Sequence, residues 1–415
     1  MKTFIHLLHL CSLFLLFGLY ETSSAQTSFI TINGVLKDAS TGEKISFAAI
    51  TIPNTGVGTV SNSRGEFTLK VNTSLGAEYF EVSHLSYTTA KFKISEAVGT
   101  EKTFHLEIHP ITLREIPVMP ADAREMVEMA LKNIKQNYSE IPNMMTGFYR
   151  EYIMERREYI SLTEAVIDIY KAPYLNIQSD RVKIYKGRMS SRVEKADTLL
   201  VQLQGGPFVM LLLDIVKNKD LSIELDELDY YQFDFETIVY IDDQLHWVIN
   251  FLPYLATDLP LYFGRLYISQ DNLAITRAEF NLDLRDEASA ATVFIKKKPL
   301  GMVFRPISTS YLVTYKEQNG KYFLNYVRAD LKFRCDWKKR IFKNNYTIMS
   351  ELAITDRRED NIVKFESQEV FKWNMIFAEK VQDFTDPDFW GEYNIIDPEE
   401  SIENAIKKLM KSSRK

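Results

Sequence analysis

The sequence is poor in the residues and motifs on which several common enzyme classes depend. Its 415 residues include only two cysteines and six histidines. No H-E-x-x-H or H-x-x-E spacing occurs, and the G-x-S-x-G and G-x-x-x-x-G-K-S/T motifs are absent as well. These patterns hold the metal of zinc peptidases, the nucleophile of many serine hydrolases and the phosphates of bound nucleotides. The sequence therefore predicts none of these activities, and it predicts no cofactor.

Cysteine is too scarce for an intramolecular disulfide in the mature chain. Cys11 lies in the apolar leader described below, which leaves Cys335 alone. Cys335 lies in a strand-like segment, on the same face as the apolar residues Leu331, Phe333 and Trp337. We therefore expect a buried structural thiol and not a nucleophile. The fold must then depend on its hydrophobic core.

An excess of positive charge is also missing. Lysine and arginine together number 50 against 56 acidic residues, which gives a net charge of -6. Nucleic-acid binding needs a concentrated basic surface, so a nucleic-acid partner is not expected. Hydrophobic residues make up 46% of the chain, enough for one large core or two moderate ones, and the length favours two domains.

One long apolar run lies near the N-terminus. It covers residues 7–19, follows Lys2 and precedes the small residues Ser23–Ala25. This order is typical of a secretory signal peptide, and we expect residues 1–25 to be removed. An uncleaved anchor is the alternative, because residues 4–20 approach the length that spans a bilayer. The expected location is the periplasm, or the periphery of the outer membrane.

Residues 29–108 alternate apolar and polar side chains in short segments that end at glycine-containing turns, which predicts a small antiparallel sandwich. Within it, GVLKDASTGEKISFAAITIPNTGVGTVSNSRGEFTLKV resembles the carboxypeptidase regulatory-like domain, a prealbumin-like sandwich common in exported proteins of Bacteroidetes. The motifs that carry the resemblance are Gly34, Asp38–Gly42, Phe47-Ala48, Gly58-Thr59 and Gly65–Phe67. The resemblance implies an interaction or spacing module at residues 27–110, without peptidase activity.

The rest of the chain predicts a second, β-rich domain. Residues 111–121 contain two prolines and read as a linker, so the domain would cover 122–415. Asn319-Gly320 between two alternating segments predicts a hairpin. Asp122 is placed to cap a helix, and residues 397–409 have the pattern of another. The expected architecture is a long curved antiparallel sheet or half-barrel with a few helices and one solvent-exposed face.

Three further stretches carry resemblances. Segments 137–151 and 388–406 resemble a poorly characterised group of Bacteroidetes proteins that join this front domain to a β-rich domain. Segment 247–280 resembles the hairpins of periplasmic lipoprotein carriers, which form an incomplete barrel around an apolar cavity. The latter resemblance implies a half-barrel, and it identifies no functional residues.

The helix predicted from Pro207 is apolar on more than one face, so it either lies in the core or covers an apolar ligand. In the second interpretation Phe208, Leu212 and Leu213 form a lid over the ligand. The alternative is an ordinary core helix, which the packing of proteins favours.

Two weak metal candidates deserve mention. His105, Glu107 and His109 share one face of a predicted strand, although the solvated side of a sandwich has the same pattern and is the favoured interpretation. Residues 386–397 have an incomplete calcium-loop spacing, in which Trp390 occupies a ligand position. No metal is therefore predicted.

These observations favour a non-enzymatic binding or assembly protein of the cell envelope that holds an apolar ligand in its second domain. One alternative is a structural accessory that docks on a protein of an outer-membrane complex. Another is a hydrolase built on carboxylates such as Glu151 and Glu164, which leave no local signature.

Overall fold

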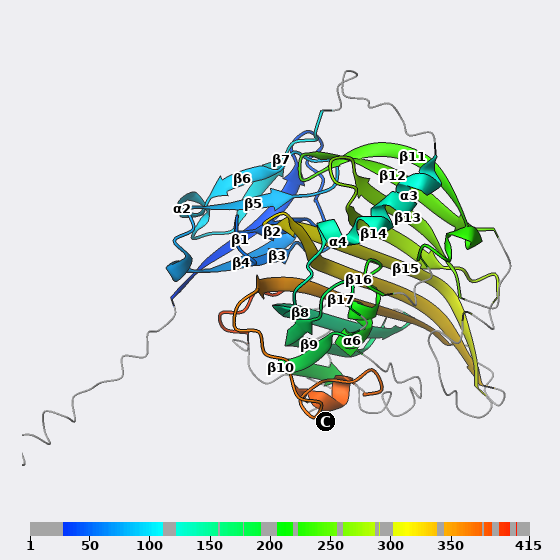
Figure 1. Ribbon diagram of the computed structural model, residues 1–415. Coiled ribbons are helices and arrows are strands. Elements are labelled where there is room, and N and C mark those ends of the chain that lie inside the picture. The colour runs from blue at the N-terminus through cyan, green and yellow to red at the C-terminus, as the bar shows by residue number, and fades with distance from the viewer. Residues whose placement is uncertain are drawn as a thin grey trace, which may run out of the picture.

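The computed structural model shows two β-structures that follow one another along the chain (Figure 1). It describes residues 28–110, 122–156, 158–176, 178–191, 206–218, 223–254, 260–286, 290, 302–337, 344–375, 377–383, 390–398 and 404. The predicted signal peptide, the linker, the first part of the calcium-type loop and most of the predicted C-terminal helix lie outside these residues. None of the described helices is long and apolar enough to cross a membrane.

The first structure is a sandwich of two small sheets, which confirms the expectation from alternation and turns, although it is not wholly antiparallel because β1 and β7 pair in parallel. One sheet has the order β4-β1-β7 and the other β3-β2-β5-β6. Phe67, Phe80 and Phe104 form the centre of its core, with ring centroids 5.4–6.2 Å apart. The elements are β1 (Phe29–Asp38), β2 (Ala49–Thr51), β3 (Gly58–Val60), β4 (Glu66–Asn72), η1 (Thr73–Leu75), β5 (Tyr79–Ser83), β6 (Ala90–Lys93), α2 (Ile94–Ala97) and β7 (Lys102–Leu106).

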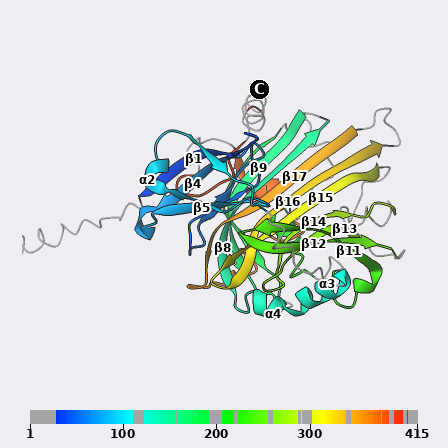
Figure 2. The same cartoon turned by 90° about the horizontal axis from the view of Figure 1, so that it is seen from above.

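The second structure is a curved sheet of eleven strands in the order β11-β12-β13-β14-β15-β16-β17-β8-β9-β10-β18 (Figures 1 and 2). Its pairs are antiparallel apart from the short β10–β18 pair. The mainly β fold class is thus confirmed. The strands are β8 (Asn143–Glu155), β9 (Glu158–Lys171), β10 (Arg181–Ser191), β11 (Tyr231–Ile241), β12 (Gln244–Pro253), β13 (Tyr262–Ser269), β14 (Ile275–Leu282), β15 (Met302–Gln318), β16 (Lys321–Trp337), β17 (Asn344–Arg358) and β18 (Gln382–Asp383).

Helices fill the concave side of this sheet. Met126 and Val127 of α3 and Met210 and Leu211 of α6 belong to one large core with the inward residues of the strands. Asp122 caps α3 as predicted, because its Oδ1 accepts from the main-chain N–H groups of the first turn. The helices are α3 (Ala123–Lys132), α4 (Ile134–Asn137), α6 (Gly206–Leu212), η4 (Leu228–Tyr230) and η5 (Phe377–Lys380).

The expectation of one solvent-exposed face is wrong for the middle of the sheet. On β8, Tyr149 faces the concave core, whereas Phe148 packs in a second core on the convex face with Val60, Trp390 and Ile396. Successive residues of a strand point to opposite faces, so both neighbours are buried only where both faces are covered. The sandwich and the segment 390–398 supply the outer cover.

Two local predictions are confirmed. Asn319 and Gly320 form the two-residue turn between β15 and β16, with φ of 55° and 77°. Cys335 is buried between strands, and burial raises the pKa of its thiol to about 12, so the thiolate nucleophile is not formed at neutral pH.

Candidate binding cavity between the sandwich and the curved sheet

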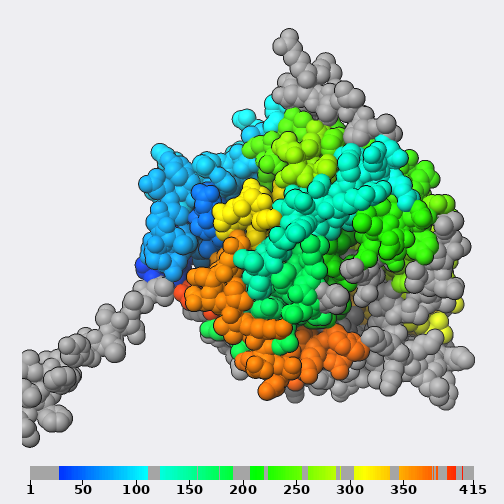
Figure 3. Space-filling view, viewed as in Figure 1, coloured from blue at the N-terminus to red at the C-terminus, as the bar shows by residue number. Residues whose placement is uncertain are grey.

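The sandwich lies against the rim of the curved sheet, where hairpin turns meet it. Figure 3 shows the yellow β15–β16 hairpin between the blue sandwich and the cyan helices. Ser86 N donates to Tyr240 O at 2.8 Å, and the rings of Tyr240 and His109 stack with centroids 3.6 Å apart. Thr89 N donates to Asp243 Oδ1 at 3.0 Å. The two structures thus meet through polar and aromatic groups at turns.

The C-terminal segment 390–398 holds the sandwich from another side. Lys70 N donates to Asn394 Oδ1 at 2.7 Å, and Asn394 Nδ2 donates to Lys70 O at 3.1 Å. Lys70 lies on β4, an edge strand, so the Asn394 amide satisfies main-chain groups that a neighbouring strand would otherwise pair. Thr68 Oγ1 donates to Asp397 Oδ2 at 2.9 Å.

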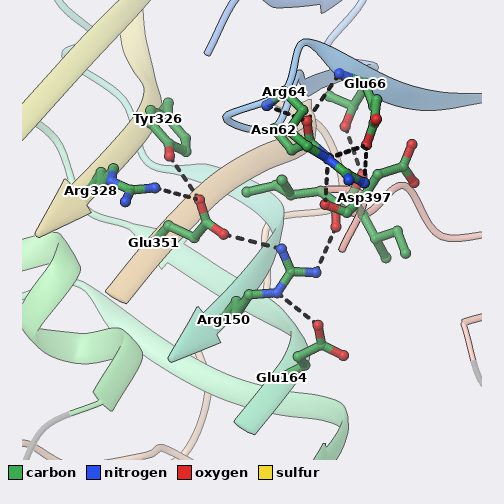
Figure 4. Close-up of polar contacts among 12 residues, drawn as sticks. Asn62, Arg64, Glu66, Arg150, Glu164, Tyr326, Arg328, Glu351 and Asp397 are labelled. Atoms are coloured by element: carbon green, nitrogen blue, oxygen red, sulfur yellow. Dashed lines mark hydrogen bonds and ion pairs between the residues drawn. The ribbon is translucent and has the colours of Figure 1, made fainter. Parts of the chain in front are cut away.

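Beneath this segment lies a buried ionic network centred on Arg150 (Figure 4). Its Nε donates to Glu164 Oε1 at 2.8 Å, its Nη1 to Glu351 Oε1 at 3.2 Å, and its Nη2 to Ile396 O at 2.7 Å. Tyr326 OH donates to Glu351 Oε2 at 2.8 Å. One guanidinium therefore joins three strands of the sheet to the C-terminal segment.

A cavity of about 480 Å³ lies where the sandwich meets the hairpin turns. Its walls are residues 51–56 and 58 and parts of β5 and β6 on the sandwich side. On the other side they are the turns of the β11–β12 and β15–β16 hairpins with residues of β12, β14, β16 and β17. Small-molecule sites commonly enclose roughly 300–1,000 Å³ and lie preferentially between domains. Size and position therefore make this cavity the candidate functional site.

Turn residues shape the cavity. Asn54, Asp242, Asp243 and Asn319 line it, and all four adopt the left-handed conformation, with φ between 51° and 59°. Asn and Asp adopt this conformation more readily than other residues with a side chain. The tight turns that it allows place three loops from distant parts of the chain around one space.

Gly56 fixes one wall of the cavity. A Cβ atom at this position would lie 2.4 Å from both the main-chain N and O of Arg357. Only glycine allows so close an approach of two backbones. The β2–β3 turn is therefore packed directly on the end of β17.

Two buried polar side chains line the cavity with unused hydrogen-bonding atoms. His246 is 1% exposed and Thr276 is 3% exposed, and neither His246 Nε2 nor Thr276 Oγ1 has a partner among the described residues. His246 Nδ1 lies 2.8 Å from Gln244 O, so the proton is on Nδ1 and Nε2 is an acceptor. Burial lowers the pKa of His246, which keeps the ring neutral. Buried polar atoms normally have partners, so we expect a water molecule or a ligand group at each of these two atoms.

Most charged groups of the cavity wall are already engaged with one another. Lys316 Nζ donates to Asp242 Oδ1 at 2.7 Å, and Lys91 Nζ lies 2.9 Å from Glu81 Oε1. Arg357 donates from Nε to Gln318 Oε1 and from Nη1 to two further acceptors, with its guanidinium 3.5 Å from the Phe323 ring centroid. The wall is thus polar but offers little free charge.

A second cavity of about 50 Å³ adjoins the first and shares Thr276 with it. His84 lines this space, and its buried Nδ1 atom has no partner among the described residues. Burial lowers the pKa of His84 to about 4, so the ring is neutral at pH 7. At roughly 30 Å³ per water molecule, this polar space has room for one or two waters.

The structure places the three predicted lid residues away from both cavities. Leu213 is buried in the concave core, Phe208 packs partly against it, and Leu212 is 39% exposed. Asp214, just after α6, binds the fully buried Lys171 at 2.6 Å. A moving lid would have to break this ion pair, and the apolar-ligand site on α6 stays a prediction.

The other candidate residues do not assemble into a site in the described part of the chain. His105 and Glu107 are exposed, while His109 is stacked on Tyr240, and no metal-binding group of three or more His, Cys, Asp or Glu side chains occurs there. Glu164 is paired with Arg150 on the convex face, whereas Glu151 lies on the concave face beside Tyr149. Because they face opposite ways, these two carboxylates cannot act as a catalytic pair.

The cavity residues were missed because they look ordinary in sequence. His246 alternates with apolar residues in a strand, and Thr276 sits in another, as many core residues do. The sequence signal for this site is the pair of short turns at Asp242-Asp243 and Asn319-Gly320. Nothing local indicates that these turns face the same space.

Glu151 yields a pH-dependent prediction. Burial raises the pKa of its carboxyl to about 7, although Tyr149 OH donates to it at 2.7 Å. Because the pKa of the Glu151 carboxyl is higher in the folded than in the unfolded chain, the folded protein loses unfolding free energy as the pH rises through 7. Glu151→Gln, which stays neutral, should therefore gain roughly 2–3 kcal/mol relative to wild type between pH 5 and pH 9. Urea unfolding across this range measures the difference.

A matched control for this prediction is Glu128→Gln on α3, where the carboxylate is 40% exposed and pairs with Lys132. Its stability difference from wild type should stay nearly constant with pH. A Glu151→Gln difference that is equally flat would show that Glu151 is not a buried titrating group.

The fold and cavity define a two-part class of protein: a small β-sandwich docked on a curved, helix-filled antiparallel sheet. Residues 32–118 match the family described as the CarboxypepD_reg-like domain, which confirms the resemblance of the first part. No curated protein matches the chain.

Among solved structures, the chain is similar to a domain described as an outer membrane lipoprotein-sorting protein from Vibrio parahaemolyticus. The identity is 12% and the TM-score 0.25, and the match covers 59% of this chain and 95% of that chain. A DUF1329 family protein from Desulfovibrio piger is similar at 13% identity over 60% and 99% of the two chains, with a TM-score of 0.24. MucB in complex with MucA(peri) is similar at 11% identity over 57% and 98%, with a TM-score of 0.18.

Proposed function

We propose that this protein is a non-enzymatic binding protein of the cell envelope, and that it holds a polar ligand in the cavity between its sandwich and its curved sheet. The observation that carries the proposal is the pair of buried, unpartnered atoms His246 Nε2 and Thr276 Oγ1 in the cavity wall. Leaving a buried polar atom without a partner costs about 1–3 kcal/mol, a cost that a bound ligand would remove.

Binding is favoured over catalysis by the state of the charged groups. Lys316 and Lys91 are each paired with a carboxylate of the cavity wall, and Glu151 and Glu164 lie on opposite faces of the sheet. The envelope location is supported by the leader pattern of residues 1–25.

The docking alternative has a specific constraint. β3 and β4 of the sandwich contact the chain's own C-terminal segment through Thr59, Thr68 and Lys70. An envelope partner would have to use other parts of the sandwich, such as the edge strand β6. Retention of a partner by the intact chain in envelope extracts, lost on charge reversal along β6, would support this alternative.

Native mass spectrometry of the full chain purified from its own envelope tests the proposed function. We expect an extra mass on the wild-type protein that is lost in Thr276→Val, which removes the hydroxyl but keeps the shape. Without ligand, this variant should be about 1 kcal/mol more stable than wild type, because a buried unpartnered hydroxyl is gone.

The matched control is Thr309→Val. Thr309 is also a buried strand residue, but its Oγ1 accepts a hydrogen bond from Leu282 N at 2.7 Å. This variant should lose stability and keep the extra mass. Absence of any bound mass from the wild type, or equal retention by Thr276→Val, would contradict ligand binding in the cavity.

A further inference from the structure

Resting on the proposed function, we propose further that the ligand is a neutral carbohydrate. The cavity wall is rich in side chains that both donate and accept hydrogen bonds: it contains four threonines and five carboxamides, namely Asn54, Gln244, Gln318, Asn319 and Asn325. A carboxamide presents an NH₂ donor beside a carbonyl acceptor, and a threonine hydroxyl serves as either. A sugar carries adjacent hydroxyls that each donate and accept, so it is the ligand class that best suits a wall of this composition.

The charges of the wall argue against an anionic ligand. Its acidic residues are Glu81, Asp242, Asp243 and Glu317, against Lys91, Lys316 and Arg357. The two lysines are held by carboxylates of the same wall, and Arg357 already donates to three acceptors. An anion would meet excess negative charge and no uncommitted lysine.

The two unpartnered atoms of the wall call for a hydroxyl. Nε2 of the neutral His246 is an acceptor and needs a donor, whereas Thr276 Oγ1 can accept or donate. A hydroxyl group both donates and accepts, so it can pair with either atom. A carboxylate has no proton to donate at neutral pH, so it would leave Nε2 unpaired.

A peptide ligand is the main competitor and fits less well. Extended peptides bind by adding to the edge of a sheet, which satisfies their regularly spaced main-chain groups. The turns at Asn54, Asp242 and Asn319 interrupt the strands that make up the rest of this cavity wall. Turns offer side chains in an irregular arrangement, as a compact branched ligand requires.

Isothermal titration of the full chain with defined probes tests the inference. The neutral probes are maltose, lactose, cellobiose and N,N′-diacetylchitobiose; the competitors are glucuronic acid and trialanine. We expect saturable binding of at least one neutral probe, tenfold or more tighter than either competitor. Thr276→Val should weaken it at least tenfold, and Thr309→Val should leave it within twofold of wild type.

The outcomes separate the inference from the proposed function. Tighter binding of trialanine or glucuronic acid than of every neutral sugar would show that the ligand class is wrong. The same conclusion follows if no sugar binds while the copurified mass still depends on Thr276. In both cases the binding site itself stands. If no probe binds and no mass depends on Thr276, both are overturned. Sugar binding that is equal in Thr276→Val and wild type would place the carbohydrate elsewhere and overturn the inference.

Discussion

Replacing Arg150 with methionine is expected to lower the free energy of unfolding by about 3 kcal/mol, the lower end of the range for breaking a buried ion pair, because the buried carboxylates of Glu164 and Glu351 would each lose one cation and keep only Arg188 and Arg328. Both carboxylate side chains are less than 5% exposed, and the Arg150 guanidinium contacts them at 2.8 and 3.2 Å. Methionine has a similar length, so the change removes charge and hydrogen bonds more than volume. Urea unfolding at pH 7 measures the loss.

A second readout follows from the bond between Arg150 and Ile396 O, which is 2.7 Å long. Without it, the C-terminal segment loses one of its attachments to the sheet. Amide hydrogen exchange at residues 394–397 should become faster in Arg150→Met. Since this segment also holds Thr68 and Lys70 of the sandwich, amides of β4 should exchange faster as well.

The control for Arg150 is Arg265→Met, which removes an arginine that is 46% exposed and pairs with Glu236 at 2.6 Å. Surface pairs of this kind contribute about 0–1 kcal/mol. If Arg150→Met costs no more than Arg265→Met, the buried network is not what holds the convex face together.

Replacing Lys171 with methionine should have an effect of similar size, about 3–5 kcal/mol at pH 7. Lys171 is fully buried at the end of β9 and contacts Asp180 at 2.7 Å and Asp214 at 2.6 Å. Tyr315 OH also donates to Asp214 at 2.7 Å. These contacts attach the turn after α6 to the concave face, so the variant should loosen α6 before the rest of the sheet.

The loss in Lys171→Met should depend on pH in a defined direction. Lys171→Met leaves the Asp214 side chain, which is 0% exposed, without its ion pair, and the cost of this buried charge is present only while the carboxylate is ionised. The variant therefore loses least unfolding free energy, relative to wild type, at a pH below about 4, the usual pKa of aspartate in an unfolded chain. The loss grows as the pH rises above that value. Unfolding at pH 4.5 and pH 7 should therefore show a smaller difference from wild type at the lower pH.

Lys183→Met is the matched control for this second prediction. Lys183 pairs with Glu369 at the same separation of 2.6 Å, but the two side chains are 38% and 42% exposed. The loss should be about 1 kcal/mol or less and nearly independent of pH between 5 and 7. An equally small effect at Lys171 would contradict its role as the anchor of α6.

Local patterns in the sequence determined the elements of this protein. Alternation between Phe29 and Ile108 predicted the sandwich, Asn319-Gly320 predicted the β15–β16 turn, and Asp122 predicted the start of α3. Each of these features depends on residues that are close in the chain. Their physical causes are the pleat of a strand, the left-handed turn and the helix cap, which act over a few residues.

Only the tertiary structure decided which faces of the sheet are covered and where a ligand could bind. The cavity joins residues 51–56 and 58 to His246, Thr276 and Arg357, which are separated by up to about three hundred positions in the chain. Alternation alone could not show that the convex side of β8 is buried, because the cover comes from the sandwich and from residues 390–398. Burial, pairing of charges and the unpartnered atoms of His246 and Thr276 all arise from contacts between distant segments. Such contacts leave no periodic or local signal in the sequence.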